Sequence, residues 1–168
     1  MTAMGAPVIS HYLKKRLKRG KEDASRFNER KGRAVLARPE GLLIWMHGAS
    51  VGEAISMLPV IEELVARPDS PNVLVTTGTV TSARLMRERL PDGAIHQYVP
   101  VDRLPYVNRF LDHWQPDVAL WWESELWPNL VVETRALARD AEGARALDHL
   151  QLRARGPPGA VVAFAGYP

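Results

Sequence analysis

The sequence of 168 residues contains no cysteine. This absence excludes disulfide bonds, zinc sites with thiolate ligands and thiol nucleophiles, and it allows a reducing compartment. Apolar runs are also short, the longest covering residues 41–46 and 118–122, whereas a membrane-spanning helix needs about 18 to 20 consecutive apolar residues. We therefore expect that the chain does not cross a bilayer. Residues 1–13 hold no apolar stretch long enough to predict a signal peptide.

Charge is distributed unevenly in a composition that is otherwise ordinary for a globular protein, at 46% hydrophobic and 24% charged. Residues 1–39 hold eleven Lys/Arg against three Asp/Glu, a net charge of +8, whereas residues 40–168 have a net charge of −5. The cluster favours a polyanionic partner, either an anionic lipid surface or nucleic acid phosphates. A solvated basic tail without a fixed partner is the alternative. The clustered residues are Lys14, Lys15, Arg16, Lys18, Arg19 and Lys21.

Strand-like and helix-like segments alternate after this basic arm. The pattern predicts strands at residues 42–47, 72–77, 95–99 and 117–122, separated by helices at 81–90 and 103–114 and by one after the turn 48–52, with a last helix at 128–138. Pro59 predicts a kink, or a helix whose regular part starts near Leu58. Because parallel neighbours need crossover connections, the order favours an α/β fold with a Rossmann-like parallel sheet flanked by helices.

Ligands of such sheets bind beyond the carboxyl ends of the strands, which here gives the turns 48–53, 77–81, 100–103 and 123–129. The first two turns contain Ser50, Gly52, Thr77 and Thr79. Although residues 161–164 could form a strand, we do not expect the tail to complete the fold. The chain is accordingly divided into a basic arm (1–39), a Rossmann-like domain (40–138) and a divergent tail (139–168).

The turn after the first predicted strand allows three interpretations. Ser50 followed by Glu53 is a capping box, in which each side chain bonds the backbone amide of the other residue. The same turn fits G-x-S-x-G, a hydrolase nucleophile elbow, whose partners would be residues such as Asp117 and His149. In the third interpretation Glu53 is a general base in a glycine-lined crevice. Composition alone does not separate the third from the first.

Several stretches in the right order and spacing resemble the amino-terminal domain of the 3-deoxy-D-manno-octulosonic acid (Kdo) transferases, over about residues 13–137. The stretch E-x-E-L-W-P-N at 123–129 is specific for this resemblance. The other stretches are the W-M-H-G-A-S-V-G-E of 45–53, the L-P-V-I of 58–61, the V-T-T-G-T of 75–79 with Thr81, and the P-V-D of 100–102.

The resemblance implies the amino-terminal half of a GT-B glycosyltransferase, which is built from two Rossmann-like domains. Such enzymes transfer Kdo with inversion from CMP-Kdo, bound mainly by the carboxyl-terminal half, to a lipid A precursor held by the amino-terminal half. By resemblance Glu53 is the general base and Glu123 is the second functional carboxylate. The residues expected to bind the acceptor are Ser50, Gly52, Thr77 and Thr79. Without it, Glu123 and Glu125 would be interpreted as complementing a helix dipole. Trp121, Trp122 and Trp127 are expected to pack rather than to bind sugar.

The resemblance also implies partners and a location. They are the lipid A precursor and an anionic membrane surface, with no nucleic acid, at the cytoplasmic face of the bacterial inner membrane. The basic cluster would then bind membrane or lipid phosphates, with Tyr12, Leu13 and Leu17 supplying a modest apolar edge. No cofactor and no metal site are expected.

The sequence departs from the family at both ends. Relative to the family, we expect the hydrophobic anchor to be missing or reduced, the carboxyl-terminal domain to be absent, and the tail after about Arg139 to be a truncation or a shifted reading frame. We therefore expect the chain alone to be inactive. Two alternatives stay open: a non-catalytic Rossmann-like module that binds lipid or a partner chain, and a serine hydrolase that uses Ser50.

Overall fold

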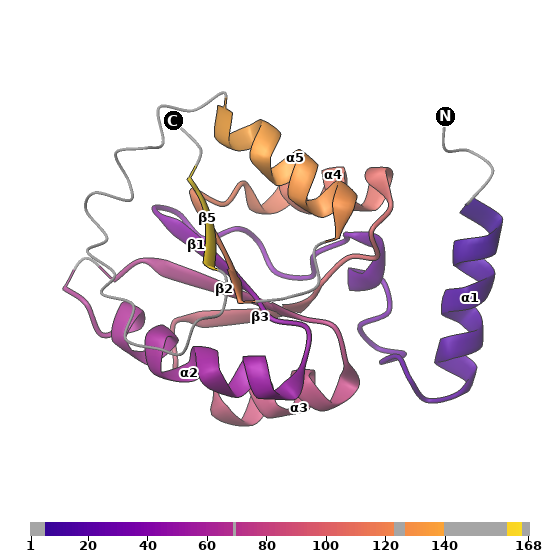
Figure 1. The fold of residues 1–168 in the computed structure, drawn as a ribbon. Helices are drawn as coiled ribbons and strands as arrows, with labels where there is room; N and C mark the ends of the chain where they lie inside the picture. Colours follow the sequence, from indigo (N-terminus) through magenta and orange to yellow (C-terminus); the bar gives the residue numbers. More distant parts are fainter. Residues whose placement is uncertain (1–5, 69, 123–126, 140–160, 166–168) are drawn as a thin grey trace.

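The structure is a computed structural model that describes residues 6–68, 70–122, 127–139 and 161–165 (Figure 1). The strands are β1 Leu43–His47, β2 Asn72–Thr77, β3 Ala94–Tyr98, β4 Val118–Trp122 and β5 Val161–Ala165. The helices are α1 Ala6–Lys18, α2 Val51–Val65, α3 Val80–Arg89, α4 Leu104–Trp114 and α5 Pro128–Arg139, with a short 3-10 helix η1 Glu29–Lys31. The four strands and the helices expected between them are confirmed.

One sheet contains all five strands in the order β3-β2-β1-β4-β5. The first four run parallel, with Trp45 of β1 opposite Leu74 of β2 and Ala119 of β4. This arrangement confirms the predicted Rossmann-like parallel sheet. β5 pairs with β4 in the antiparallel direction. The strand noted as possible at residues 161–164 therefore forms, and it adds an edge to a sheet that the tail was not expected to complete.

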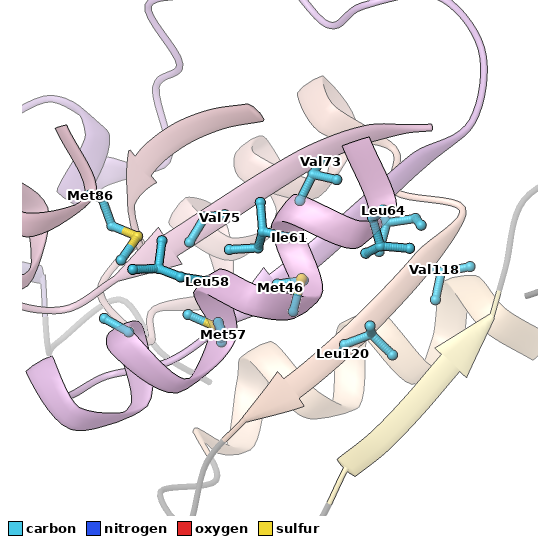
Figure 2. Packing of buried hydrophobic residues seen from close by; sticks show 12 residues of the cluster. Met46, Met57, Leu58, Ile61, Leu64, Val73, Val75, Met86, Val118 and Leu120 are labelled. Atoms are coloured by element: carbon cyan, nitrogen blue, oxygen red, sulfur yellow. The ribbon is translucent and has the colours of Figure 1, made fainter. Parts of the chain in front are cut away.

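Helices cover both faces of the sheet because alternate strand residues point in opposite directions. On one face α2 and α3 cover Ile44, Met46 and their neighbours, and Figure 2 shows Ile61, Leu64 and Met57 of α2 lying over the strands. On the other face α4 and α5 cover Trp45, Leu74 and Trp121. Burying each large apolar side chain contributes about 1.5 to 3 kcal/mol, so these two layers carry most of the folding free energy.

Helix α2 continues through Pro59 and begins at Val51. The expectation that its regular part starts near Leu58 is therefore wrong. The first turn is secured by a capping box at Ser50 and by burial of Ala54 and Met57 in the core. These contacts outweigh the hydrogen bond that proline cannot donate.

Residues 26–29 close the exposed edge of β3. Arg26 Nη2 donates to His96 O at 2.8 Å, and Tyr98 N donates to Glu29 Oε2 at 2.8 Å. Arg26 and Glu29 also form an ion pair, with Nη2 and Oε2 2.8 Å apart. Side chains thus satisfy backbone groups that an edge strand would leave open to another chain.

An ion-pair chain joins α1 to the end of β3. Glu22 is buried and forms two ion pairs. Its Oε1 lies 2.5 Å from Arg16 Nε, and its Oε2 lies 3.2 Å from Arg30 Nε. Arg30 Nη1 donates to the carbonyl oxygen of Val99, and Val101 N donates to Arg30 O at 2.9 Å. Residues 22–30 therefore pack on the sheet, although the sequence division places them in the arm. Within the described residues no helix is both long and apolar enough to span a bilayer.

Gly32 allows the segment after η1 to contact α4 closely. Its φ is +73°, and a Cβ atom built there would lie 1.9 Å from the carbonyl oxygen of Tyr106. Gly20 has a similar φ of +67°, but a Cβ atom at that position would meet nothing within 4 Å. Comparing substitutions at Gly20 and Gly32 therefore separates the cost of a left-handed backbone from the added cost of a steric clash.

We expect Gly32→Ala to lower the free energy of unfolding by about 3 kcal/mol or more, because the clash adds to the strain of a left-handed residue. Gly20→Ala should lower it by only about 1 kcal/mol, which is the strain alone. Urea unfolding of both variants measures the difference. Equal losses would contradict the close packing of Gly32 on α4.

Candidate active site

The carboxyl ends of β1 and β4 form the switch point of the sheet. The chain proceeds from β1 outward to β2 and β3 and then returns to place β4 on the other side of β1, with His47 opposite Trp121. In open parallel sheets the crevice at such a point is where ligands bind. β1 ends here at His47, followed by the turn 48–50, and β4 ends here at Trp122.

Glu53 lies in the first turn of α2 and is half-buried. Ser50 Oγ accepts from Glu53 N at 3.2 Å, and Glu53 Oε2 accepts from Ser50 N at 2.8 Å. The capping box is therefore confirmed. Among the described residues Glu53 Oε1 has no hydrogen-bond partner, so one oxygen is held by the backbone while the other is not engaged.

The hydrolase interpretation loses its acid residue. Asp117 Oδ2 accepts from Leu43 N at 2.7 Å and pairs with Arg38 at 3.2 Å. Leu43 begins β1 and Asp117 precedes β4, whereas Ser50 follows the end of β1. Asp117 and Ser50 therefore lie at opposite ends of the strands, so Asp117 is not a partner for Ser50. His149 lies outside the described residues.

The other residues expected to bind the acceptor have different surroundings. Ser50 and Gly52 are exposed at the start of α2. Thr79 is exposed and caps α3, its Oγ1 accepting from Ser82 N at 3.1 Å. Thr77 is buried, with its Oγ1 2.9 Å from His96 Nε2, so in the structure its hydroxyl braces β2 against β3.

Glu123 and Glu125 lie outside the described residues. Of the tryptophans near them, Trp121 is fully buried and packs on Trp45 with ring centroids 4.8 Å apart. Trp122 and Trp127 are half-buried against the cores on the two faces of the sheet. The expectation that these rings pack is confirmed.

A buried polar cluster under the switch point was not predicted. Thr76 Oγ1 accepts from Trp45 Nε1 at 2.8 Å and lies 2.9 Å from His47 Nδ1. His47 Nε2 is buried and has no hydrogen-bond partner among the described residues. Burial lowers the pKa of His47 to about 4, so its imidazole is neutral at pH 7. His47 belongs to the stretch that carries the resemblance, which was the available signal.

Asp102 links the loop after β3 to the start of α5. Its Oδ1 accepts from Leu130 N at 2.8 Å, and its Oδ2 accepts from Asn129 N at 3.2 Å and Asn129 Nδ2 at 3.1 Å. A carboxylate is favourable at a helix amino terminus, where backbone N–H groups lack partners. Asp102 belongs to the stretch 100–102 and Asn129 to the stretch 123–129, both of which carry the resemblance. Their hydrogen bonds bring the two stretches into contact.

The basic cluster of the arm divides into two parts. Arg16 is engaged with Glu22 and is half-buried. The rest of the cluster is exposed, namely Lys14, Lys15, Lys18, Arg19 and Lys21. Leu13, expected at a lipid-facing edge, is only 1% exposed and faces the protein instead, while Val8 and Tyr12 are 69% and 57% exposed.

Within the part of the chain that the structure describes, no group of His, Asp and Glu could hold a metal ion.

The parallel sheet and its two helical layers are consistent with the amino-terminal half of a GT-B glycosyltransferase. A family model described as 3-deoxy-D-manno-octulosonic-acid transferase (kdotransferase) matches residues 13–140. The chain belongs to this family, and the resemblance noted in the sequence is confirmed.

Three relatives illustrate the similarity. A protein of Arabidopsis thaliana called probable 3-deoxy-D-manno-octulosonic acid transferase, mitochondrial, is 38% identical over 79% of this chain and 30% of its own length. The 3-deoxy-D-manno-octulosonic acid transferases of Rickettsia bellii and Haemophilus influenzae are 37% and 36% identical, over 70% and 60% of this chain. The chain spans less than a third of the length of each, 28% and 23% for the last two.

Two buried histidines predict how stability depends on pH. Burial lowers the pKa of His96 to about 3 and that of His47 to about 4, whereas both bind protons below about pH 6.5 in the unfolded chain. The unfolded state then holds more protons, so the free energy of unfolding should fall between pH 7 and pH 5, by about 1 to 2 kcal/mol for each histidine.

Urea unfolding at pH 7, 6 and 5 measures this fall. His96→Asn should make the fall shallower, whereas His11→Asn, at an exposed position of α1, should leave it unchanged. A free energy of unfolding that stays constant from pH 7 to pH 5 would contradict the burial of neutral imidazoles.

Proposed function

We propose that this chain supplies the acceptor-binding half of an inverting Kdo transferase, with Glu53 as the general base and Glu123 as a second functional carboxylate. The donor would be CMP-Kdo and the acceptor a lipid A precursor. Family membership supports the reaction class. The observation that carries the role of Glu53 is its place in the first turn of α2, beside the switch point, with one carboxylate oxygen that bonds no described residue.

The capping box orients the proposed base. Because Ser50 N holds Glu53 Oε2, the side chain cannot rotate freely, and Oε1 is left to accept a proton. In the proposed step the acceptor hydroxyl oxygen attacks the anomeric carbon of Kdo, the bond from that carbon to the CMP phosphate breaks, and the hydroxyl proton passes to Glu53. A positioned carboxylate contributes about 10² to 10⁴ in rate to such a step.

Glu53→Gln separates the two functions of this side chain. Glutamine can keep the capping box, so the free energy of unfolding should change by less than about 0.5 kcal/mol, whereas glutamine cannot accept the proton. We expect the rate of Kdo transfer to fall by about 100-fold or more. The assay mixes or fuses the chain with the part of the Rickettsia bellii relative that this chain does not span.

The matched control is Glu62→Gln, an exposed position on the same helix, which should keep the full rate. Full activity of Glu53→Gln would rule out Glu53 as the base. If the wild-type chain supports no transfer with any supplied donor domain, the non-catalytic module becomes the better account.

We also propose that α1 lies against an anionic membrane surface, which in a bacterial relative would be the cytoplasmic face of the inner membrane. The helix exposes Val8 and Tyr12 together with five Lys/Arg that follow on α1 and the next turn. Exposed apolar side chains beside basic ones are typical of helices that rest on anionic lipid. The proposal needs no membrane span.

We expect the protein to sediment with phosphatidylglycerol-containing vesicles at low salt and to be released at high salt, because screening weakens the attraction. The variant Lys14→Gln/Lys15→Gln/Lys18→Gln should bind about tenfold more weakly or worse. The control Arg84→Gln/Arg87→Gln/Arg89→Gln removes the same charge from α3 and should bind nearly as well as wild type. Binding that ignores salt, or that falls equally in both variants, would contradict the proposal.

A further inference from the structure

Three basic side chains gather at the start of α4, and we refer to them as the α4 cationic patch. Arg103 is the N-cap residue of α4, Arg109 lies further along the helix, and Lys31 ends η1. All three are partly exposed. The sequence analysis assigned phosphate binding to the exposed lysines of the arm, and none of these three residues belongs to that cluster.

Aromatic rings and a backbone oxygen hold the patch in place. The Cζ atoms of Arg103 and Arg109 lie 4.9 and 5.9 Å from the centroid of the same ring, Tyr106. Arg109 Nη1 donates to Lys31 O at 2.6 Å, and Lys31 Nζ lies 4.8 Å from the ring of Phe27. Side chains held in this way lose little rotamer freedom when they bind, which favours recognition of an anion.

The charge of the patch is not neutralised by the described residues. Arg16, Arg26, Arg30 and Arg38 each form an ion pair with a carboxylate, whereas the three patch residues take part in no ion pair with a described residue. The neighbouring acid, Asp102, has both carboxylate oxygens occupied by the amino end of α5.

The patch lies at the carboxyl ends of the strands, where the acceptor is proposed to bind. Arg103 ends the loop after β3, and Figure 1 shows the amino ends of α4 and α5 on the same side of the sheet as α1. The dipole of α4 adds positive potential at its amino end, where Arg103 is the N-cap residue. A guanidinium group carries several N–H donors in one plane, which match the oxygens of a phosphate.

We propose that the α4 cationic patch binds a phosphomonoester. Its identification as a phosphate of the acceptor rests on the proposed function, but binding itself does not. The ligand chemistry has two sources, a headgroup in a membrane or a soluble sugar phosphate, and the experiment distinguishes them.

The test measures sedimentation of the full chain with phosphatidylcholine vesicles that contain either phosphatidic acid, a phosphomonoester, or phosphatidylglycerol, a phosphodiester, matched in surface charge. Wild-type protein should prefer phosphatidic acid. Arg103→Gln/Arg109→Gln should weaken binding to phosphatidic acid about tenfold and abolish the preference. The control Arg87→Gln/Arg89→Gln, with the same change in charge on α3 across the sheet, should keep the preference and weaken binding less than about threefold.

Soluble glucose 1-phosphate supplies the second arm. If glucose 1-phosphate releases the wild-type protein from phosphatidic acid vesicles, the patch binds soluble sugar phosphates. If it releases none, the patch binds a phosphate carried by the membrane. A preference that survives in the double variant, or is lost equally in the control, overturns the proposal.

If the double variant fails to fold, Lys31→Gln leaves the guanidinium stacking intact and should weaken phosphatidic acid binding about threefold; unchanged binding then overturns the proposal. If the wild-type chain prefers phosphatidic acid but supports no Kdo transfer with a supplied donor domain, the proposed function is refuted and the proposal for the patch stands.

Discussion

The pairing of Arg26 with Glu29 along the edge of β3 is the interaction on which the arrangement of this domain depends. Both residues come from the amino-terminal segment, and each satisfies a backbone group of a strand about seventy positions away, at His96 O and Tyr98 N. An exposed parallel edge would invite pairing with another chain. Here charged side chains occupy the edge, and they also fix where the amino-terminal segment lies.

The loop after β3 connects this closed edge to the rest of the candidate site. Arg30 contacts the backbone at Val99 and Val101, and Glu22 links Arg30 to Arg16 of α1. One residue further on, Asp102 holds the amino end of α5. The helix proposed to meet the membrane and the helix that follows the second switch-point turn are therefore joined through one short loop. Such a connection suits the proposed function, in which a lipid surface carries the acceptor.

The alternation of strands and helices was sufficient to predict the sheet, and the S-x-x-E spacing was sufficient to predict the cap at Ser50 and Glu53, because both depend on neighbours within a few residues. Interactions across long separations were not predictable. Glu22 and Arg30 counted as part of a solvated basic arm, and only the fold shows that they are buried. The face on which Thr77 points depends on strand register, which a single sequence does not determine. The role of Gly32 depends on a helix more than seventy residues later.

Native-state hydrogen exchange at the amides of Tyr98, Val101 and Leu130 tests this account most directly. Each amide donates to a partner that is distant in sequence, namely Glu29 Oε2, Arg30 O and Asp102 Oδ1. If the amino-terminal segment, the loop after β3 and α5 form one unit with the sheet, all three amides should exchange as slowly as those of β1 and β2. Rapid exchange at these three positions, with the central strands still protected, would contradict it.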